Sequence, residues 1–155
     1  MAAQNTTIFI FSSITGITQS LREADSTLPL QEIQDDALSG YGGTVEFNPT
    51  KLENDTLIKL KQAEILISEP FVVAKLLEFD KDSLASLDWG FSTYAGVDPI
   101  FKSTKISFPL HFKLTRFAGC FGQPISEWCI AHIIGHERGF AASAKDQLQK
   151  NWAGS

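Results

Sequence analysis

The sequence contains little of what most specialised protein classes require. It has two cysteines in 155 residues, together with 11 glycines and 6 prolines. Two cysteines cannot form the disulfide framework of a small secreted domain, and we expect them to be buried thiols in a reducing compartment. Glycine and proline are too few for a fibrous or low-complexity protein. The low numbers of cysteine, glycine and proline therefore indicate an ordinary globular domain.

Long apolar runs and clustered positive charge are also missing. No run approaches the ~20 apolar residues of a membrane-spanning helix, and no Lys or Arg precedes Arg22, so we expect no secretory or transit peptide and a cytoplasmic location. The net charge of -5 argues against nucleic acid and anionic membranes as partners. The charge is -9 over residues 1–100 and +4 over residues 101–155. The positive charge of residues 101–155 favours an anionic ligand or an acidic partner. The alternative is that these charges are scattered over a solvated surface.

Short apolar segments alternate along the chain with segments of helical spacing. The patterns predict strands over residues 7–11, 44–47, 64–68, 87–93 and 111–115, a turn over 39–43, and helices over 19–38, 52–60, 70–79, 96–101, 123–140 and 146–152. The strands are apolar throughout, which is typical of a parallel sheet buried on two faces. We therefore predict an α/β fold in which helices cover both faces of a parallel sheet.

The loop over residues 92–98, Ser-Thr-Tyr-Ala-Gly-Val-Asp, is the first candidate binding site. Parallel sheets bind ligands beyond the carboxyl ends of their strands, and this loop follows a predicted strand. Small residues at Ala95 and Gly96 let the backbone approach a ligand, and unpaired N–H groups before a helix attract carboxylate or phosphate. Ala95, Gly96 and Val97 are therefore our predicted substrate-binding residues, with Asp98 as a cap. The alternative is a tight turn without a ligand.

The predicted helix over 123–140 carries a possible metal site. Cys129, His132 and His136 share one helical face, because they are spaced i, i+3 and i+7. Cys and His bind zinc, but no Glu follows His132 as in zinc proteases, and no second cluster offers a fourth ligand. Packing within the helix is the favoured interpretation, and we predict no metal.

Other catalytic signatures are missing from the chain. It has no Gly-x-Ser-x-Gly motif and no phosphate-loop lysine signature. The glycines over residues 40–43 are not a dinucleotide fingerprint, because the third glycine would fall on Val45. Residues 12–16, Ser-Ser-Ile-Thr-Gly, only loosely approximate a phosphate loop. A module binding flavin or phosphate is the weakest alternative.

Three stretches together resemble a known family. They are Ile65–Pro70, Leu87–Asp98, and Leu114 through Trp128 to Trp152. Their order and spacing resemble the N-terminal part of D-isomer-specific 2-hydroxyacid dehydrogenases, nearest to the glyoxylate/hydroxypyruvate-reductase-like branch. The likeness covers roughly residues 63–152.

The resemblance implies a fold and a ligand. The family has a flavodoxin-like substrate domain, split in sequence by an inserted dinucleotide-binding domain. Its loop matching Ala95–Gly96 holds the carboxylate of a small 2-oxoacid or 2-hydroxyacid through backbone N–H groups. The loop at Glu69–Pro70 matches a lip of the substrate cleft. We thus expect an incomplete flavodoxin-like substrate domain over residues 1–122, and over 123–155 a hinge helix and the start of the nucleotide-binding domain.

The resemblance also implies what these residues do not supply. In the family, the Gly-x-Gly-x-x-Gly turn and the catalytic Arg, Glu and His come after the tryptophan matching Trp152. We expect no catalytic residue and no cofactor site here, although NAD or NADP serves the complete family enzyme. The chain is then the substrate-binding portion of such a reductase, truncated before the cofactor domain and inactive alone. The alternative is a non-enzymatic interaction domain that forms a homodimer through the exposed residues Trp128, Ile130, Ile133 and Ile134.

Overall fold

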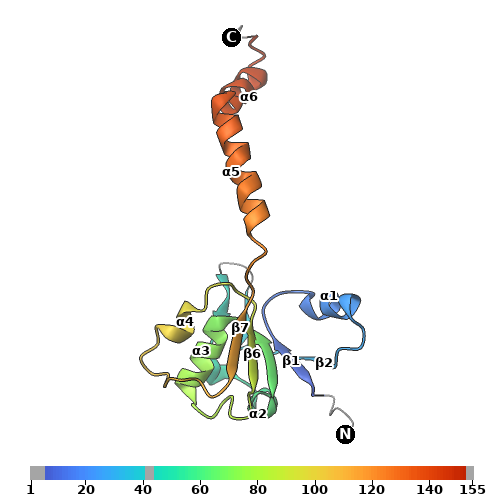
Figure 1. Ribbon diagram of the computed structural model, residues 1–155, viewed down its shortest axis with the longest axis vertical. Coiled ribbons are helices and arrows are strands. Elements are labelled where there is room, and N and C mark those ends of the chain that lie inside the picture. The colour runs from blue at the N-terminus through green and yellow to red at the C-terminus, as the bar shows by residue number, and fades with distance from the viewer. Residues whose placement is uncertain (1–5, 41–43, 153–155) are drawn as a thin grey trace. The chain divides into compact units, whose positions relative to one another are not determined.

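The computed structural model describes residues 6–40 and 44–152 (Figure 1). They form two compact units, Met1–Phe117 and Ala118–Ser155. The boundary between the units lies slightly before the domain boundary at residue 122 that we predicted from the sequence. The roles assigned to the two parts stay predictions.

A five-stranded sheet organises the first unit. Its strands are β1 (Ile8–Phe11), β2 (Leu30–Glu32), β5 (Ile65–Ser68), β6 (Trp89–Ser92) and β7 (Lys113–Arg116). All neighbours are parallel, in the order β2-β1-β5-β6-β7. Counted along the chain, this is the 2-1-3-4-5 order of flavodoxin-like folds. The predicted fold class is therefore confirmed.

Helices lie on both sides of this sheet. They are α1 (Ile17–Ala24), α2 (Asn54–Gln62), α3 (Pro70–Phe79) and α4 (Asp98–Phe101), with a 3₁₀ turn at Pro49–Lys51. Figure 1 shows α1 on one side and α3 and α4 on the other. Pro70 occupies the first turn of α3, where its missing N–H costs no hydrogen bond. The core between sheet and helices includes Phe11, Leu66 and Leu76, all fully buried.

The predicted helix over residues 19–38 is confirmed only as far as Ala24, and its remainder is wrong. The helix α1 ends at Ala24, because Asp25 adopts an extended backbone and accepts hydrogen bonds from Thr27 Oγ1 (2.6 Å) and Thr27 N (2.9 Å). The same bonds, that of the Thr27 hydroxyl first, lower the pKa of the Asp25 carboxyl. This local turn competes with the helix, and the chain then enters β2 as an edge strand of the sheet.

The strand predicted over residues 44–47 does not join the main sheet. It is β4 (Glu46–Phe47), which pairs antiparallel with β3 (Leu38–Ser39) in a separate two-stranded sheet. Gly40 has φ +95°, and an added Cβ would lie 2.4 Å from the Thr44 carbonyl oxygen. The predicted turn otherwise falls on residues 41–43, which lie outside the described residues.

The second unit is two consecutive helices. They are α5 (Gly122–Glu137) and α6 (Phe140–Leu148), separated by Gly139 with φ +59°. The predicted helix over 123–140 is confirmed for most of its length, whereas the last helix begins earlier than predicted because Gly139 restarts it in the left-handed conformation. None of the described residues of this unit is buried. Cys120 and Cys129 are exposed, so the expectation of buried thiols is wrong.

Within residues 6–40 and 44–152, no helix combines the length and the apolar sequence that a membrane span requires.

Candidate functional site

The carboxyl ends of four strands meet at one edge of the sheet. Phe11 of β1 lies opposite Ser68 of β5, Ser68 lies opposite Ser92 of β6, and Ser92 lies opposite Arg116 of β7. The loops that leave these strands therefore start side by side. This is the edge at which open parallel sheets bind ligands.

The predicted loop leaves β6 at this edge. Its first turn is closed by Ser92, whose hydroxyl accepts from Tyr94 N (3.2 Å) and donates to Tyr94 O (2.9 Å). The ring of Tyr94 contacts Phe71 of α3 edge-on at 6.2 Å between centroids. These contacts hold the start of the loop against the domain and leave the following residues to project beyond the strand.

Ala95, Gly96 and Val97 follow this turn and precede α4. Ala95 and Val97 are half-buried and Gly96 is exposed. Among residues 6–40 and 44–152, no acceptor takes a hydrogen bond from the backbone N–H groups of these three residues. Because α4 has four residues, the backbone amides are the relevant donors rather than a helix dipole. Three consecutive amides thus have no acceptor within the described chain, and their binding role stays a prediction.

Arg116 reaches the same loop from the end of β7. Its Nη1 donates a hydrogen bond of 2.8 Å to the Ala95 carbonyl oxygen. Our sequence reasoning missed Arg116, because only the register of β6 with β7 places residue 116 beside residue 95. Its position at the end of a predicted strand was the available signal.

Glu69 connects the loops after β1 and β5. It is fully buried, and its Oε1 accepts from Ser12 Oγ (2.8 Å), Ser13 N (2.9 Å) and Ser13 Oγ (2.9 Å). Within the described chain, Glu69 Oε2, Ser68 Oγ and Thr93 Oγ1 are buried without a hydrogen-bond partner. Sequence reasoning placed Glu69 at the edge of a cleft but did not identify this network. Glu69 fixes the two loops to each other.

The residues at the β1–β5 switch point do not fit a phosphate group. A flavin or dinucleotide phosphate would need free N–H and hydroxyl donors after β1. Ser12 and Ser13 already donate to the acidic side chain of Glu69. An acidic group in that position repels phosphate, and the glycine spacing of a dinucleotide turn is missing from the sequence. The geometry therefore gives no support to the flavin or phosphate alternative.

One of the three candidate metal ligands on α5, His132, has contacts within its own helix, whereas Cys129 is an exposed free thiol. The Nδ1 of His132 lies 2.9 Å from the Trp128 carbonyl oxygen, and its ring stacks on the Trp128 indole with centroids 3.7 Å apart. In the described part of the chain, no three His, Cys, Asp or Glu side chains are close enough to hold a metal ion. His111 has its own structural contact, with Nε2 3.0 Å from the Leu84 carbonyl oxygen. The contacts of His132 agree with the hydrogen-bonded alternative for that residue, and the absence of a metal site stays a prediction.

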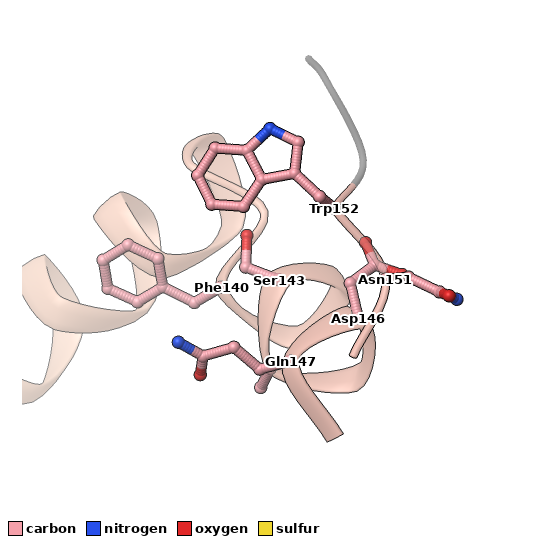
Figure 2. A pocket seen from close by; sticks show the side chains of 7 residues that line it. Phe140, Ser143, Asp146, Gln147, Asn151 and Trp152 are labelled. Carbon is pink, nitrogen blue, oxygen red and sulfur yellow. The ribbon is translucent and has the colours of Figure 1, made fainter. Parts of the chain in front are cut away.

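An open hollow lies beside α6. Figure 2 shows Phe140 and Ser143 of α6 on one side and Trp152 on the other. Trp152 is 98% exposed, so the hollow has no fixed wall on that side. The lining contains a single acidic side chain, Asp146, and no basic one. It offers no convergent set of polar groups for catalysis or anion binding.

Comparisons with known proteins support the fold. A scan against protein-family models and a search of curated proteins found no match. A solved structure, the D-isomer specific 2-hydroxyacid dehydrogenase family protein from Aeromonas salmonicida subsp. salmonicida A449, is similar with a TM-score of 0.69 and 24% identity. The alignment covers 98% of this chain and 42% of that protein. This chain therefore shares the fold of the aligned part of that protein. The aligned part is less than half of that protein's length.

Proposed function

We propose that the unit Met1–Phe117 binds the carboxylate of a small 2-oxoacid or 2-hydroxyacid. It does so as the substrate-side part of an NAD(P)-dependent D-2-hydroxyacid dehydrogenase of the glyoxylate/hydroxypyruvate-reductase type. The observation that carries the proposal is the run of N–H groups at Ala95, Gly96 and Val97 that have no acceptor within the described residues, in a partly exposed loop at the carboxyl edge of the sheet.

The contrast between neighbouring loops supports this assignment. Glu69 Oε1 accepts the hydrogen bonds that Ser12 and Ser13 donate after β1, whereas the amides of Ala95, Gly96 and Val97 after β6 have no acceptor in the described chain. A carboxylate accepts several N–H bonds, and hydrogen bonds to a charged acceptor are the stronger class. The carboxylate of Asp98 opposes an anion there, since its Oδ2 lies 3.4 Å from where a Gly96 Cβ would be. Lys102 Nζ, 3.4 Å from Asp98 Oδ1, offsets that charge.

The chemistry assigned to these residues is binding and orientation. Reduction of a 2-oxoacid needs a nicotinamide, which supplies hydride when bound, and a group that protonates the oxygen. The residues at the carboxyl edge do not fit a dinucleotide. We therefore expect no oxidation of NADH or NADPH by this 155-residue chain with glyoxylate. Turnover above a no-protein control would contradict this part of the proposal.

An NMR titration tests the binding site directly. Glyoxylate added to the ¹⁵N-labelled chain should shift the amides of Ala95, Gly96 and Val97, while glycolaldehyde, which lacks the carboxylate, should not. Gly96→Val should abolish the response, because the side chain enters the exposed space beside the amides. Gly122→Val is the matched control, since a Cβ there meets no atom within 4 Å. Equal responses to both probes, or none at residues 95–97, would refute the site.

A second function is favoured by the surface of α5. Trp128, Ile130, Ile133 and Ile134 are 62%, 57%, 63% and 48% exposed. A helix that is apolar on all sides is normally buried, and such surface marks an interface. A non-enzymatic domain that forms a homodimer through α5 would explain this exposure. Sedimentation of the wild type beside Ile133→Glu tests it: a dimer that the variant dissociates supports it, and a wild-type monomer rejects it.

A further inference from the structure

We propose that Arg116 is the positioning residue of this carboxylate site, and that it acts by orienting the peptide between Ala95 and Gly96. The inference rests on the proposed function. The observation that carries it is the 2.8 Å hydrogen bond from Arg116 Nη1 to the Ala95 carbonyl oxygen. That oxygen belongs to the same peptide unit as the unpaired Gly96 N–H group.

The geometry of the peptide bond transmits the contact. A trans peptide is planar, and its C=O and N–H groups point in opposite directions. A guanidinium that holds the Ala95 oxygen therefore fixes the direction of the Gly96 N–H. Withdrawing electron density at the oxygen also makes this N–H a stronger donor, because linked hydrogen bonds polarise one another. Arg116 thus prepares the amide before an anion arrives.

The position of Arg116 suits this role. The end of β7 lies beside the end of β6, where Ser92 pairs with Arg116, so the side chain crosses only to the adjacent loop. Across the described residues, no carboxylate forms an ion pair with Arg116. The guanidinium keeps its positive charge and donors beyond the one given to Ala95.

A role limited to holding the loop makes a different prediction. If the hydrogen bond only holds the loop in place, its loss should shift the NMR signals of every loop amide and lower the thermal midpoint of the domain. A positioning contact acts mainly on the Gly96 N–H and on anion affinity. Arg116→Lys separates the two roles further, since lysine keeps the charge but presents a single ammonium in place of the planar guanidinium.

The experiment repeats the glyoxylate titration on the whole chain with Arg116→Gln, Arg116→Lys and Lys113→Gln. Lys113 is the matched control, because it is an exposed cation at the opposite end of the same strand. We expect Arg116→Gln to raise the dissociation constant about tenfold or more. Arg116→Lys should recover part of the affinity, and Lys113→Gln should change it less than about twofold. The ligand-free Gly96 amide should shift more than those of Ala95 and Val97 in Arg116→Gln.

The possible failures are distinguishable. If the wild type does not respond to glyoxylate at residues 95–97, the proposed function fails. If the wild type responds and Arg116→Gln binds as well as Lys113→Gln does, only the inference about Arg116 fails. If Arg116→Gln lowers the thermal midpoint and shifts all three amides equally, or if Arg116→Lys recovers no affinity, Arg116 is a structural contact and the inference is again rejected.

Discussion

The two units of the chain use apolar residues in opposite ways. In Met1–Phe117, apolar residues of strands and helices meet in a core where Phe11, Leu66 and Leu76 are almost inaccessible to water. In Ala118–Ser155, the apolar helix α5 leaves Trp128 and Ile133 more than half exposed. Both units contain large apolar side chains, but only in the first unit do neighbouring elements cover them. The comparison shows that a core depends on facing surfaces and not on apolar residues alone.

Hydrogen exchange should show the largest difference between the units. Amides of β5 and β6 lie in the middle of the sheet and should exchange only on global opening, roughly a thousandfold or more slower than unprotected amides. Amides of α5 should exchange fast, since an isolated helix of 16 residues is marginally stable in water. Equal protection of α5 and β5 would break the comparison and reveal a partner surface on α5.

A matched pair of leucines should give the next largest difference. Leu66→Ala removes a side chain that is 1% exposed in the core, and should cost about 3 kcal/mol in the free energy of unfolding. Leu148→Ala removes one that is 87% exposed at the end of α6, and should change it by less than about 0.5 kcal/mol. Urea unfolding measures both. Similar losses would mean that Leu148 is covered in solution.

The buried acidic network is the next point of contrast. Glu69→Ala leaves the two hydroxyls and the N–H of Ser12 and Ser13 without their acceptor, which should cost about 2 kcal/mol. The control is Glu137→Ala at the exposed end of α5, where we expect almost no change. Both are read by urea unfolding. A stable Glu69→Ala protein would show that water replaces the carboxyl group.

The smallest expected effect is a pH dependence within the first unit. Hydrogen bonding from Asp82 N–H and then from Lys61 lowers the pKa of the Asp80 carboxyl below its ordinary value of 3.8. A lowered folded pKa means that the ionised carboxyl stabilises the fold above about pH 4, and that this contribution is lost as the pH falls through the folded value. Asp80→Asn should therefore lose slightly less stability than the wild type between pH 6 and 3. Identical pH profiles would contradict the assignment.

Local signals predicted the regular elements well where nothing competed with them. The apolar run ending at Ser68, followed by Pro70, predicted both β5 and α3. The helix predicted over 19–38 was wrong beyond Ala24, because the Asp25–Thr27 turn stops α1. The strand β2 was missed, because it has too few residues for a periodic signal. Gly139 was not recognised as the break between α5 and α6, since glycine is also tolerated inside helices.

The residues of the candidate site likewise include some that local sequence predicts and some that depend on tertiary structure. Small residues before a helical turn were enough to select Ala95, Gly96 and Val97 as candidates. Glu69 and Arg116 were not selected, because their partners are 56 and 21 residues away in sequence. No local pattern encodes such pairs, which exist only once the strands have taken their order and register.

By itself, the sequence determined the alternation of apolar strands and helices, and with it the parallel α/β architecture, because periodicity and burial are local consequences of residue type. Tertiary structure alone decided which loops share an edge, which donors stay unpaired and which apolar helix is left uncovered. The physical reason is that hydrogen bonding and burial depend on which residues are neighbours in space. The order of the strands in the sheet determines those neighbours.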